Sequence, residues 1–101
     1  MDLKFCGFDW DEGNREKSLR KHQVNCQEAE EVFLGSPMVY VDERHSTEEE
    51  KRYVLFGKTN PGRTLLIAFT MREEKVRIIS ARPMSQKERK WYEEESRKTN
   101  P

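Results

Sequence analysis

Hydrophobic residues fall into short clusters along the chain, and the spacing within each cluster predicts alternating strands and helices. From Leu3 to Trp10, apolar and polar positions roughly alternate, which indicates a short strand at an edge of a sheet. Asp11 is placed to cap a first helix that runs to about Lys21. This helix has almost no apolar stripe. The pattern therefore predicts a polar surface helix with Lys21 and His22 at its end, where the helix dipole favours cations.

A second helix is predicted by the segment Asn25-Cys26-Gln27-Glu28, which has the form of a capping box. The apolar positions that follow share one helical face and are Ala29, Val32 and Phe33. Gly35-Ser36-Pro37 ends this helix after Leu34, because glycine and proline disfavour its continuation.

Four apolar segments typical of strands follow, with a polar, acidic connection over 42–51 and a turn at Asn60-Pro61-Gly62. The last three segments are so close in sequence that each must pair antiparallel with the next, which predicts a β-meander. The predicted strands are Met38–Val41, Arg52–Lys58, Thr64–Met71 and Lys75–Arg82.

A final helix is predicted by Ser85-Gln86-Lys87-Glu88, a second capping box, and extends through about Ser96. Its expected apolar contacts are Met84, Trp91 and Tyr92. We expect a single domain over 1–97 and a frayed tail over 98–101. The predicted fold class is α+β, an antiparallel β-meander sheet with two N-terminal helices and one C-terminal helix packed on it.

The composition is very polar, because 34% of the 101 residues are hydrophobic and 38% are charged, and it leaves room for one modest core. The 19 basic and 19 acidic residues cancel, so no overall field attracts nucleic acid. Between Arg63 and Arg82, however, five basic residues stand against two acidic ones. An anionic ligand is therefore expected on this part of the chain.

Cys6 and Cys26 have neither the spacing nor the histidine partners of a metal site, and we expect two reduced, half-buried thiols. No metal ion or other cofactor is expected. The chain also lacks an apolar run of about 18 residues and a hydrophobic signal core. These features predict a soluble protein in a reducing compartment, the cytoplasm, with no membrane partner.

The last hairpin has a predicted register. With 72–75 as its loop, regular pairing sets 71 opposite 76, 69 opposite 78, 67 opposite 80 and 65 opposite 82. The bulkier face, expected under the helices, carries Leu65, Ile67, Phe69, Met71, Val76, Ile78, Ser80 and Arg82. The thinner face carries Leu66, Ala68, Thr70, Arg72, Arg77, Ile79 and Ala81. Arg77 and Arg82 are thus expected on opposite faces, and both can act at one site only if the strand twists or bulges.

Arg72 and Arg77, on the thinner face, have two interpretations. A guanidinium presents a planar set of donors matched to phosphate oxygens, so arginines on a rigid sheet suit a phosphate that gains charge during a reaction. Exposed strand arginines also pair commonly with acidic neighbours, and Glu73 and Glu74 are available here. The spacing alone leaves both interpretations open.

A series of segments runs in order along nearly the whole chain, and the most specific of them is Arg77–Arg82, with the sequence Arg-Ile-Ile-Ser-Ala-Arg. The others are Phe8-Asp9-Trp10-Asp11, Lys21-His22, Glu31-Val32-Phe33, His45-Ser46, Arg52, Gly57, Gly62-Arg63, Thr70-Met71-Arg72, Glu88 and Tyr92. Together they resemble the BrnT family, toxins of type II toxin–antitoxin modules. The chain departs from the usual pattern of this family at Asn14, Ser18 and Gln23, which replace lysine, asparagine and a helix-ending glycine.

The resemblance implies a RelE-like ribonuclease fold that works without a metal ion, with RNA as its substrate. It also implies a protein partner, a BrnA-type antitoxin, which is a ribbon-helix-helix DNA-binding protein. Toxin and antitoxin are then expected to form a heterotetramer that represses its own operon, so that operator DNA is bound only through the antitoxin.

Metal-free RNA cleavage normally uses the RNA 2′-hydroxyl as nucleophile, so the enzyme must assist proton transfers and stabilise the phosphate. With the resemblance, this assigns phosphate stabilisation to Arg77 and Arg82, and Ser80 either binds substrate or orients Arg82. Arg72 positions RNA. The expected catalytic residues are His22, Arg72, Arg77, Ser80, Arg82 and Tyr92, with His22 and Tyr92 as candidate acid or base. The expected further RNA contacts are Lys21, Arg63 and Lys75.

Two other function classes stay open. No residue in the sequence is an unambiguous general base, so the chain can also be a catalytically degenerate module that still binds antitoxin and acts as co-repressor of its operon. A general RNA-binding domain is the third class, and the zero net charge and the lack of an aromatic strand motif count against it.

Overall fold

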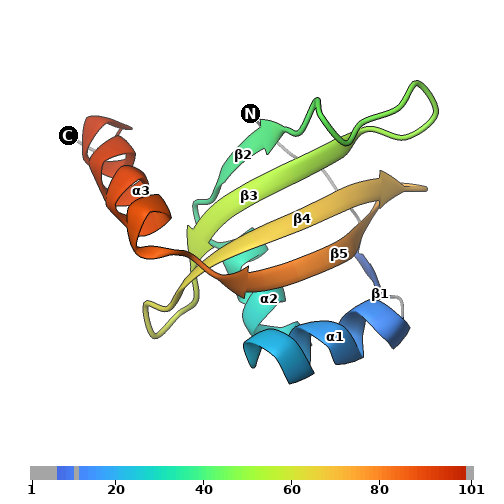
Figure 1. The fold of residues 1–101 in the computed structure, drawn as a ribbon, viewed down its shortest axis with the longest axis horizontal. Helices are drawn as coiled ribbons and strands as arrows, with labels where there is room; N and C mark the ends of the chain where they lie inside the picture. Colours follow the sequence, from blue (N-terminus) through green and yellow to red (C-terminus); the bar gives the residue numbers. More distant parts are fainter. Residues whose placement is uncertain (1–6, 11, 100–101) are drawn as a thin grey trace.

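Five strands form one sheet in the order β1-β5-β4-β3-β2, and the computed structural model describes residues 7–10 and 12–99 (Figure 1). The strands are β1 (Phe8–Trp10), β2 (Met38–Val41), β3 (Arg52–Lys58), β4 (Thr64–Arg72) and β5 (Lys75–Pro83), and the helices are α1 (Glu12–His22), α2 (Cys26–Leu34) and α3 (Gln86–Thr99). Strands β2 to β5 are an antiparallel meander, and β1 lies parallel to β5 at one edge. The predicted α+β class and its meander are confirmed.

Most predicted boundaries agree with the structure to within one residue. Of the predicted first strand, Phe8–Trp10 is observed, while residues 1–6 and the proposed cap Asp11 lie outside the described residues. Helix α3 continues to Thr99, beyond the predicted end at Ser96, so residues 98 and 99 belong to the helix. In this last turn the exposed Lys98 pairs with Glu95 at 3.1 Å.

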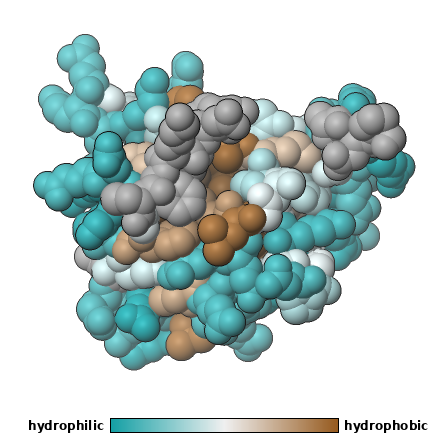
Figure 2. All heavy atoms as spheres, turned by 180° about the vertical axis from the view of Figure 1, so that it is seen from behind, coloured by the Kyte–Doolittle hydropathy of each residue, from teal (hydrophilic) through white to brown (hydrophobic). Residues whose placement is uncertain are grey.

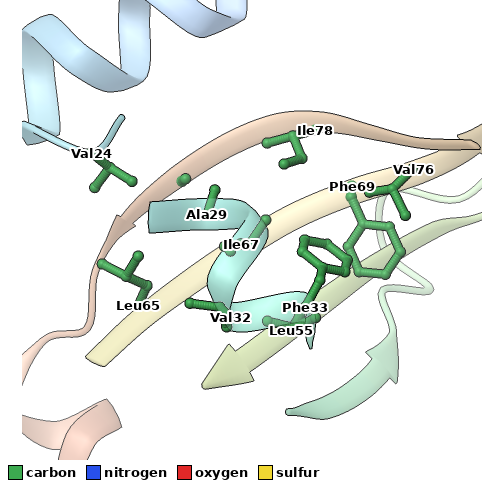
Figure 3. Packing of buried hydrophobic residues seen from close by; sticks show 11 residues of the cluster. Val24, Ala29, Val32, Phe33, Leu55, Leu65, Ile67, Phe69, Val76 and Ile78 are labelled. Atoms are coloured by element: carbon green, nitrogen blue, oxygen red, sulfur yellow. The ribbon is translucent and has the colours of Figure 1, made fainter. Parts of the chain in front are cut away.

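The core lies between α2 and one face of the sheet, which we call the covered face. Helix α2 directs Ala29, Val32 and Phe33 at the strands, as the sequence predicts (Figure 3). Strand residues buried beneath them are Leu55, Leu65, Ile67, Phe69, Val76 and Ile78. The ring of Phe33 packs edge-on against that of Phe69, with centroids 4.9 Å apart.

Gly57 lets α2 approach β3 closely. A Cβ built at this position would lie 2.5 Å from Cγ1 of Val32, which is too close for a carbon–carbon contact. The missing side chain thus makes room for Val32, itself only 1% exposed, and sets the distance between the helix and the sheet.

Both predicted capping boxes are present. Before α2, the Asn25 side chain accepts from the Glu28 N–H at 2.8 Å, and the Glu28 carboxylate accepts from the Asn25 N–H at 3.2 Å. Before α3, Ser85 and Glu88 exchange the same two bonds at 3.2 and 2.8 Å. Each box satisfies two N–H groups that the helix itself leaves unpaired.

Helix α1 ends with Gln23 in the left-handed region, at a φ of 55°, and its N–H donates to the Leu19 carbonyl at 3.0 Å. This is the helix end that a glycine normally occupies. A side chain there costs about 1 kcal/mol, because Cβ crowds the following carbonyl. The helix end that the family usually gives to glycine thus keeps its left-handed conformation here with glutamine in place.

We expect Gln23→Gly to raise the free energy of unfolding by about 0.5–1 kcal/mol, since glycine removes that crowding. Urea denaturation measures the change, and Gln23→Ala is the matched control because alanine keeps the Cβ and should bring no gain. A Gly variant no more stable than the Ala variant would show that the helix end is not strained.

Ser18 ties α1 to the edge of β5. Its side chain is 2% exposed, and its Oγ accepts a hydrogen bond from the Ala81 N–H at 3.2 Å. Strand β1 pairs with β5 only from Val76 to Ile78, so Ser18 takes over beyond the end of this pairing. A hydroxyl here satisfies a strand N–H that has no neighbouring strand.

The β4–β5 hairpin departs from its predicted register. Met71 lies opposite Val76 and Phe69 opposite Ile78, as predicted, but β5 bulges at Ile79, an extra residue that has no partner because the next β4 residue, Ala68, pairs with Ser80. Beyond the bulge, Ala68 lies opposite Ser80, Ile67 opposite Ala81, Leu66 opposite Arg82 and Leu65 opposite Pro83. The predicted pairs of 67 with 80 and of 65 with 82 are therefore wrong. An extra residue reverses the alternation that follows it.

Figure 1 shows that one side of the sheet is covered by a helix and the other side is not. Helix α2 passes behind the strands, no helix lies in front of β3, β4 and β5, and α3 projects at the end where β3 and β5 finish. Seen from behind, the molecule is mostly hydrophilic with small hydrophobic areas (Figure 2). None of the described helices combines the length and the apolar run needed to cross a bilayer.

Candidate functional site

The bulge places the predicted site residues of β5 on one face of the sheet. Because paired residues share a face, Ser80 lies beside Ala68 and Arg82 beside Leu66, on the side away from α2. We call this side the open face. Its polar residues include Asp9, Arg52, Lys58, Thr64, Thr70, Arg72, Lys75, Arg77, Ser80 and Arg82. The expectation that Ser80 and Arg82 lie under the helices is therefore wrong, because regular alternation does not hold across Ile79.

Arg82 forms a bidentate ion pair with Glu88, the third residue of α3. Its two terminal nitrogens each donate to a different carboxylate oxygen of Glu88, both at 2.8 Å. The hydrogen bonds from Arg82 lower the pKa of Glu88 from 4.5 to about 2, although partial burial opposes this shift. The same bonds raise the pKa of Arg82 above its usual value. Glu88 therefore joins the start of α3 to the open face.

Glu88→Gln tests this pair selectively, because glutamine can keep the capping-box hydrogen bond while the charge is lost. We expect the variant to be about 1–2 kcal/mol less stable than the wild type at neutral pH. The pKa of Glu88 is lower in the folded protein, so its contribution is complete above pH 4.5 and is lost as the pH falls toward about 2. Urea denaturation across this range checks it: a stability difference that does not shrink with acidification contradicts the account.

The other two arginines of the hairpin also meet carboxylates from elsewhere in the chain. Arg77 pairs with Asp9 of β1, and Arg72 with Glu50 of the loop before β3, each at 3.2 Å. Beside these pairs is a polar hollow of about 540 Å³, lined by Asp9, Arg72, Glu73 and Lys75. Glu73 and Glu74 form the tip of the hairpin, both with positive φ.

Ion pairs thus neutralise the hairpin arginines, in agreement with the zero net charge of the chain. A carboxylate that accepts from a guanidinium occupies the position that a phosphate oxygen would take. An anionic ligand must displace these carboxylates or share the arginines with them. Arg52 differs, because it lies on the same face, half-buried, and makes no ion pair within the described part of the chain.

Arg77 and Arg82 are spaced along the sheet. Their partners on β4 are Thr70 and Leu66, four residues apart, which corresponds to about 13 Å at the usual rise of a strand. Ser80, opposite Ala68, lies midway. This spacing suits successive contacts along an extended polyanion better than two contacts with one phosphate group.

Arg63 and the end of α1 form a separate structural cluster. The Arg63 guanidinium donates to the carbonyls of His22 at 3.0 Å and Gln23 at 2.8 Å, and it pairs with Glu28 at 2.8 Å. Burial raises the pKa of Glu28, but the hydrogen bond and charge of Arg63 and the Asn25 N–H outweigh it, so the pKa is lowered overall. Arg63 therefore binds the end of α1 to the turn before β4.

Two candidate acid–base residues lie apart from the hairpin arginines. His22 is half-buried at the end of α1, beside the exposed Lys21. Tyr92 is 7% exposed on α3, and Nζ of Lys58 lies 5.9 Å from the centre of its ring. Among residues 7–10 and 12–99, no hydrogen bond or ion pair connects either side chain to Arg77 or Arg82.

No group of three His, Cys, Asp or Glu side chains in the described residues is arranged to hold a metal ion. Cys26 is a free, half-buried thiol, as predicted, and Cys6 lies outside the described residues.

Residues 10–88 match the family model described as "Ribonuclease toxin, BrnT, of type II toxin-antitoxin system". The chain belongs to the BrnT family. This match runs from the last residue of β1 to the third residue of α3, and so includes strands β2 to β5 of the open face and Glu88. The BrnT family is one of ribonuclease toxins, each with an antitoxin partner and an RNA target, so the predicted resemblance is confirmed.

A solved structure shares the fold of this BrnT-family chain. The crystal structure of the Brucella abortus ribonuclease toxin, BrnT, aligns with a TM-score of 0.62 at 24% sequence identity, over 79% of this chain and 97% of that one. No curated protein matches the sequence.

Sequence reasoning missed the ion pairs that join the arginines to carboxylates. It also named Arg52 only as part of the family resemblance, without a role at the site. Asp9 lies 68 positions from Arg77, and Glu50 lies 22 positions from Arg72, so no local spacing reveals either pair. Arg52 was detectable in principle, because the register of β3 against β4 sets it opposite Thr70 and therefore on the open face.

Proposed function

We propose that this BrnT-family chain is a metal-independent endoribonuclease that binds RNA along its open face. The observation that carries the proposal is the bulge at Ile79, which brings Arg77, Ser80 and Arg82 onto the uncovered side of the sheet. The sheet backbone holds these donors at a fixed spacing, which favours stabilisation of charge that builds up on a phosphate once RNA has displaced the carboxylates.

In the proposed reaction, the RNA 2′-hydroxyl gives its proton to a general base and attacks the adjacent phosphate. The bond between phosphorus and the 5′ oxygen breaks, and the leaving 5′ oxygen takes a proton from a general acid, so that the products are a 2′,3′-cyclic phosphate and a 5′-hydroxyl. Arg77 and Arg82 bind phosphates of the strand, one of them the scissile phosphate, with Ser80 donating or accepting a hydrogen bond between them. The guanidinium at the scissile phosphate offsets its added charge. The carboxylates of Asp9 and Glu88 keep the two arginine side chains extended until phosphates of the RNA take the place of these carboxylates.

The remaining predicted residues differ in the observations that support a role for them in RNA binding or cleavage. Arg72 and Lys75 line the polar hollow at the end of the open face, which suits contacts with a neighbouring phosphate. His22 and Tyr92 stay candidate acid–base groups, to be tested by substitution. Lys21 and Arg63 are proposed contacts for RNA beyond the open face, and Arg63 has in addition its structural bonds to α1.

We further propose a BrnA-type ribbon-helix-helix antitoxin as the neutralising partner, in a heterotetramer that contacts operator DNA through the antitoxin. The family assignment supports a partner of this kind. The expected location is the cytoplasm, where RNA and antitoxin are both present.

A second candidate function is supported by the ion pairs themselves. If Asp9, Glu50 and Glu88 permanently occupy the arginines, the chain binds antitoxin and helps to repress its operon without cleaving RNA.

Induced expression distinguishes the two functions. The enzyme predicts growth arrest and RNA loss, relieved by co-expression of the antitoxin, and purified protein that cleaves RNA equally well with and without a metal chelator. Normal growth with folded, soluble protein would contradict the enzyme and favour the repressor. Cleavage that stops on chelation would overturn the metal-independent mechanism alone.

A further inference from the structure

Three aromatic side chains from three elements surround a groove at the α3 end of the open face. Tyr40 comes from β2, Phe56 from β3 and Trp91 from α3. The ring centroid of Trp91 lies 5.8 Å from that of Tyr40 and 4.9 Å from that of Phe56. The groove has a volume of about 440 Å³, and its other lining residues are Val54, Lys87 and Glu88. We call it the aromatic groove.

These rings do not belong to the core. The core lies on the covered face beneath α2, whereas Trp91 is 37% exposed and Tyr40 41% exposed. Large exposed rings gathered at one place are unusual on a chain of such low hydrophobic content, and they provide flat apolar surfaces to a ligand.

The groove is continuous with the proposed phosphate site. Phe56, Leu66 and Arg82 form one row across three neighbouring strands of the open face. Two strand spacings, about 10 Å, separate the backbone of Phe56 from that of Arg82. Glu88 belongs to both places, because it lines the groove and accepts both hydrogen bonds from Arg82.

Positive charge surrounds the groove on the α3 side. Lys87, Arg89 and Lys90 are exposed on the first turns of α3, and none of them has an ion pair within the part of the chain that the structure describes. Together with Gln86 and Glu93 they line a second hollow of about 540 Å³, and Lys87 lines both hollows. Unpaired cations beside a cluster of aromatic rings suit a single-stranded polyanion carrying flat bases better than an apolar protein segment.

We propose that the aromatic groove is a nucleobase subsite, which stacks an unpaired base of the RNA strand whose phosphate lies at Arg82. This inference rests on the proposed function. Base–aromatic stacking contributes about tenfold to a hundredfold in affinity per base and tolerates different bases. The subsite therefore selects single-stranded RNA and holds its register relative to Arg77 and Arg82, with little preference for sequence.

The test measures binding of a fluorescently labelled single-stranded RNA oligonucleotide that carries 2′-O-methyl groups and cannot be cleaved. We expect Trp91→Ala to weaken binding at least tenfold, and Trp91→Phe, which keeps a ring, to weaken it about threefold or less. Leu34→Ala is the matched control, because Leu34 is a large hydrophobic residue, 75% exposed, on α2. It should leave the affinity unchanged.

Oligonucleotides with a single abasic position give a second readout. At one of these positions, loss of the base should weaken binding to the wild type by the same factor as Trp91→Ala does. Loss of the same base should not weaken binding to the Trp91→Ala variant any further. This coupling requires the base and the ring to meet, which a structural role of Trp91 would not produce.

The outcomes separate the two proposals. If Arg82→Ala weakens binding but Trp91→Ala does not, the subsite is refuted and the proposed function stands. If Trp91→Ala loses antitoxin binding instead of RNA binding, the groove is a protein interface and the subsite is again refuted. A wild-type protein that neither binds nor cleaves RNA would overturn the proposed function together with the subsite.

Discussion

Replacement of either Arg77 or Arg82 by alanine is expected to lower the rate of RNA cleavage by about 10²–10³-fold, the usual loss when one donor to a charged transition state is removed. Both side chains lie on the open face, one on each side of Ser80. Lysine at either position keeps the charge but loses the planar donor set, so Arg77→Lys and Arg82→Lys should recover only part of the rate. Growth inhibition on induction should fall in the same order.

Arg97→Ala is the control for loss of positive charge, since Arg97 is exposed on α3 away from the hairpin. Circular dichroism must show that each variant is folded, because Arg82→Ala also leaves Glu88 without its partner. If Arg77→Ala and Arg82→Ala, correctly folded, cleave RNA at the wild-type rate, the arginines are structural and the open face is not the site.

Phe69→Ala is expected to cause the largest loss of stability, about 3–5 kcal/mol. Phe69 is fully buried on the covered face, where its ring contacts Phe33 at 4.9 Å and stacks on Tyr53 at 5.3 Å between centroids. The alanine leaves a cavity that strands on both sides cannot fill by a small movement. For a chain of this length the loss is a large part of the total stability.

Leu19→Ala is the matched control for Phe69→Ala, because Leu19 is 54% exposed on α1 and should change stability by no more than about 0.5 kcal/mol. The shift of the urea midpoint measures both variants. A Phe69→Ala protein within about 1 kcal/mol of the wild type would mean that the covered face is not the main core.

Local chemistry allowed much of the fold to be predicted from the sequence. A capping box needs only two residues three positions apart, so both helix starts at Asn25 and Ser85 were correctly predicted and are confirmed by their hydrogen bonds. The meander followed from short connections between apolar segments, a rule that depends on chain length alone.

The bulge could not be derived from alternation, because that rule assumes a regular strand. A physical signal was nevertheless present. The doublet Ile78-Ile79 shifts the apolar phase from one face to the other, and an unbroken strand would have buried Arg82 against the core, which is costly for a charged group. Read in this way, the sequence favours an extra residue near Ile79.

Contacts between residues far apart in the sequence are the other features that could not be predicted. The distances in sequence between Arg63 and the two carbonyls that it binds are 41 and 40 positions. Nothing local to Arg63 predicts that the turn before β4 meets the end of α1. The same holds for Asp9 beside Arg77, since their contact depends on β1 pairing parallel to β5.

If Arg77 and Arg82 lie on one RNA-binding face, both side chains must respond when RNA binds, and this response can be observed for each arginine. The measurement is an NMR titration of the side-chain Nε–Hε signals with non-cleavable single-stranded RNA. We expect the signals of Arg52, Arg72, Arg77 and Arg82 to shift together with one dissociation constant, while that of Arg97, exposed on α3 away from the hairpin, shifts little. Shifts confined to Arg63 and the end of α1, with Arg77 and Arg82 unmoved, would contradict this expectation.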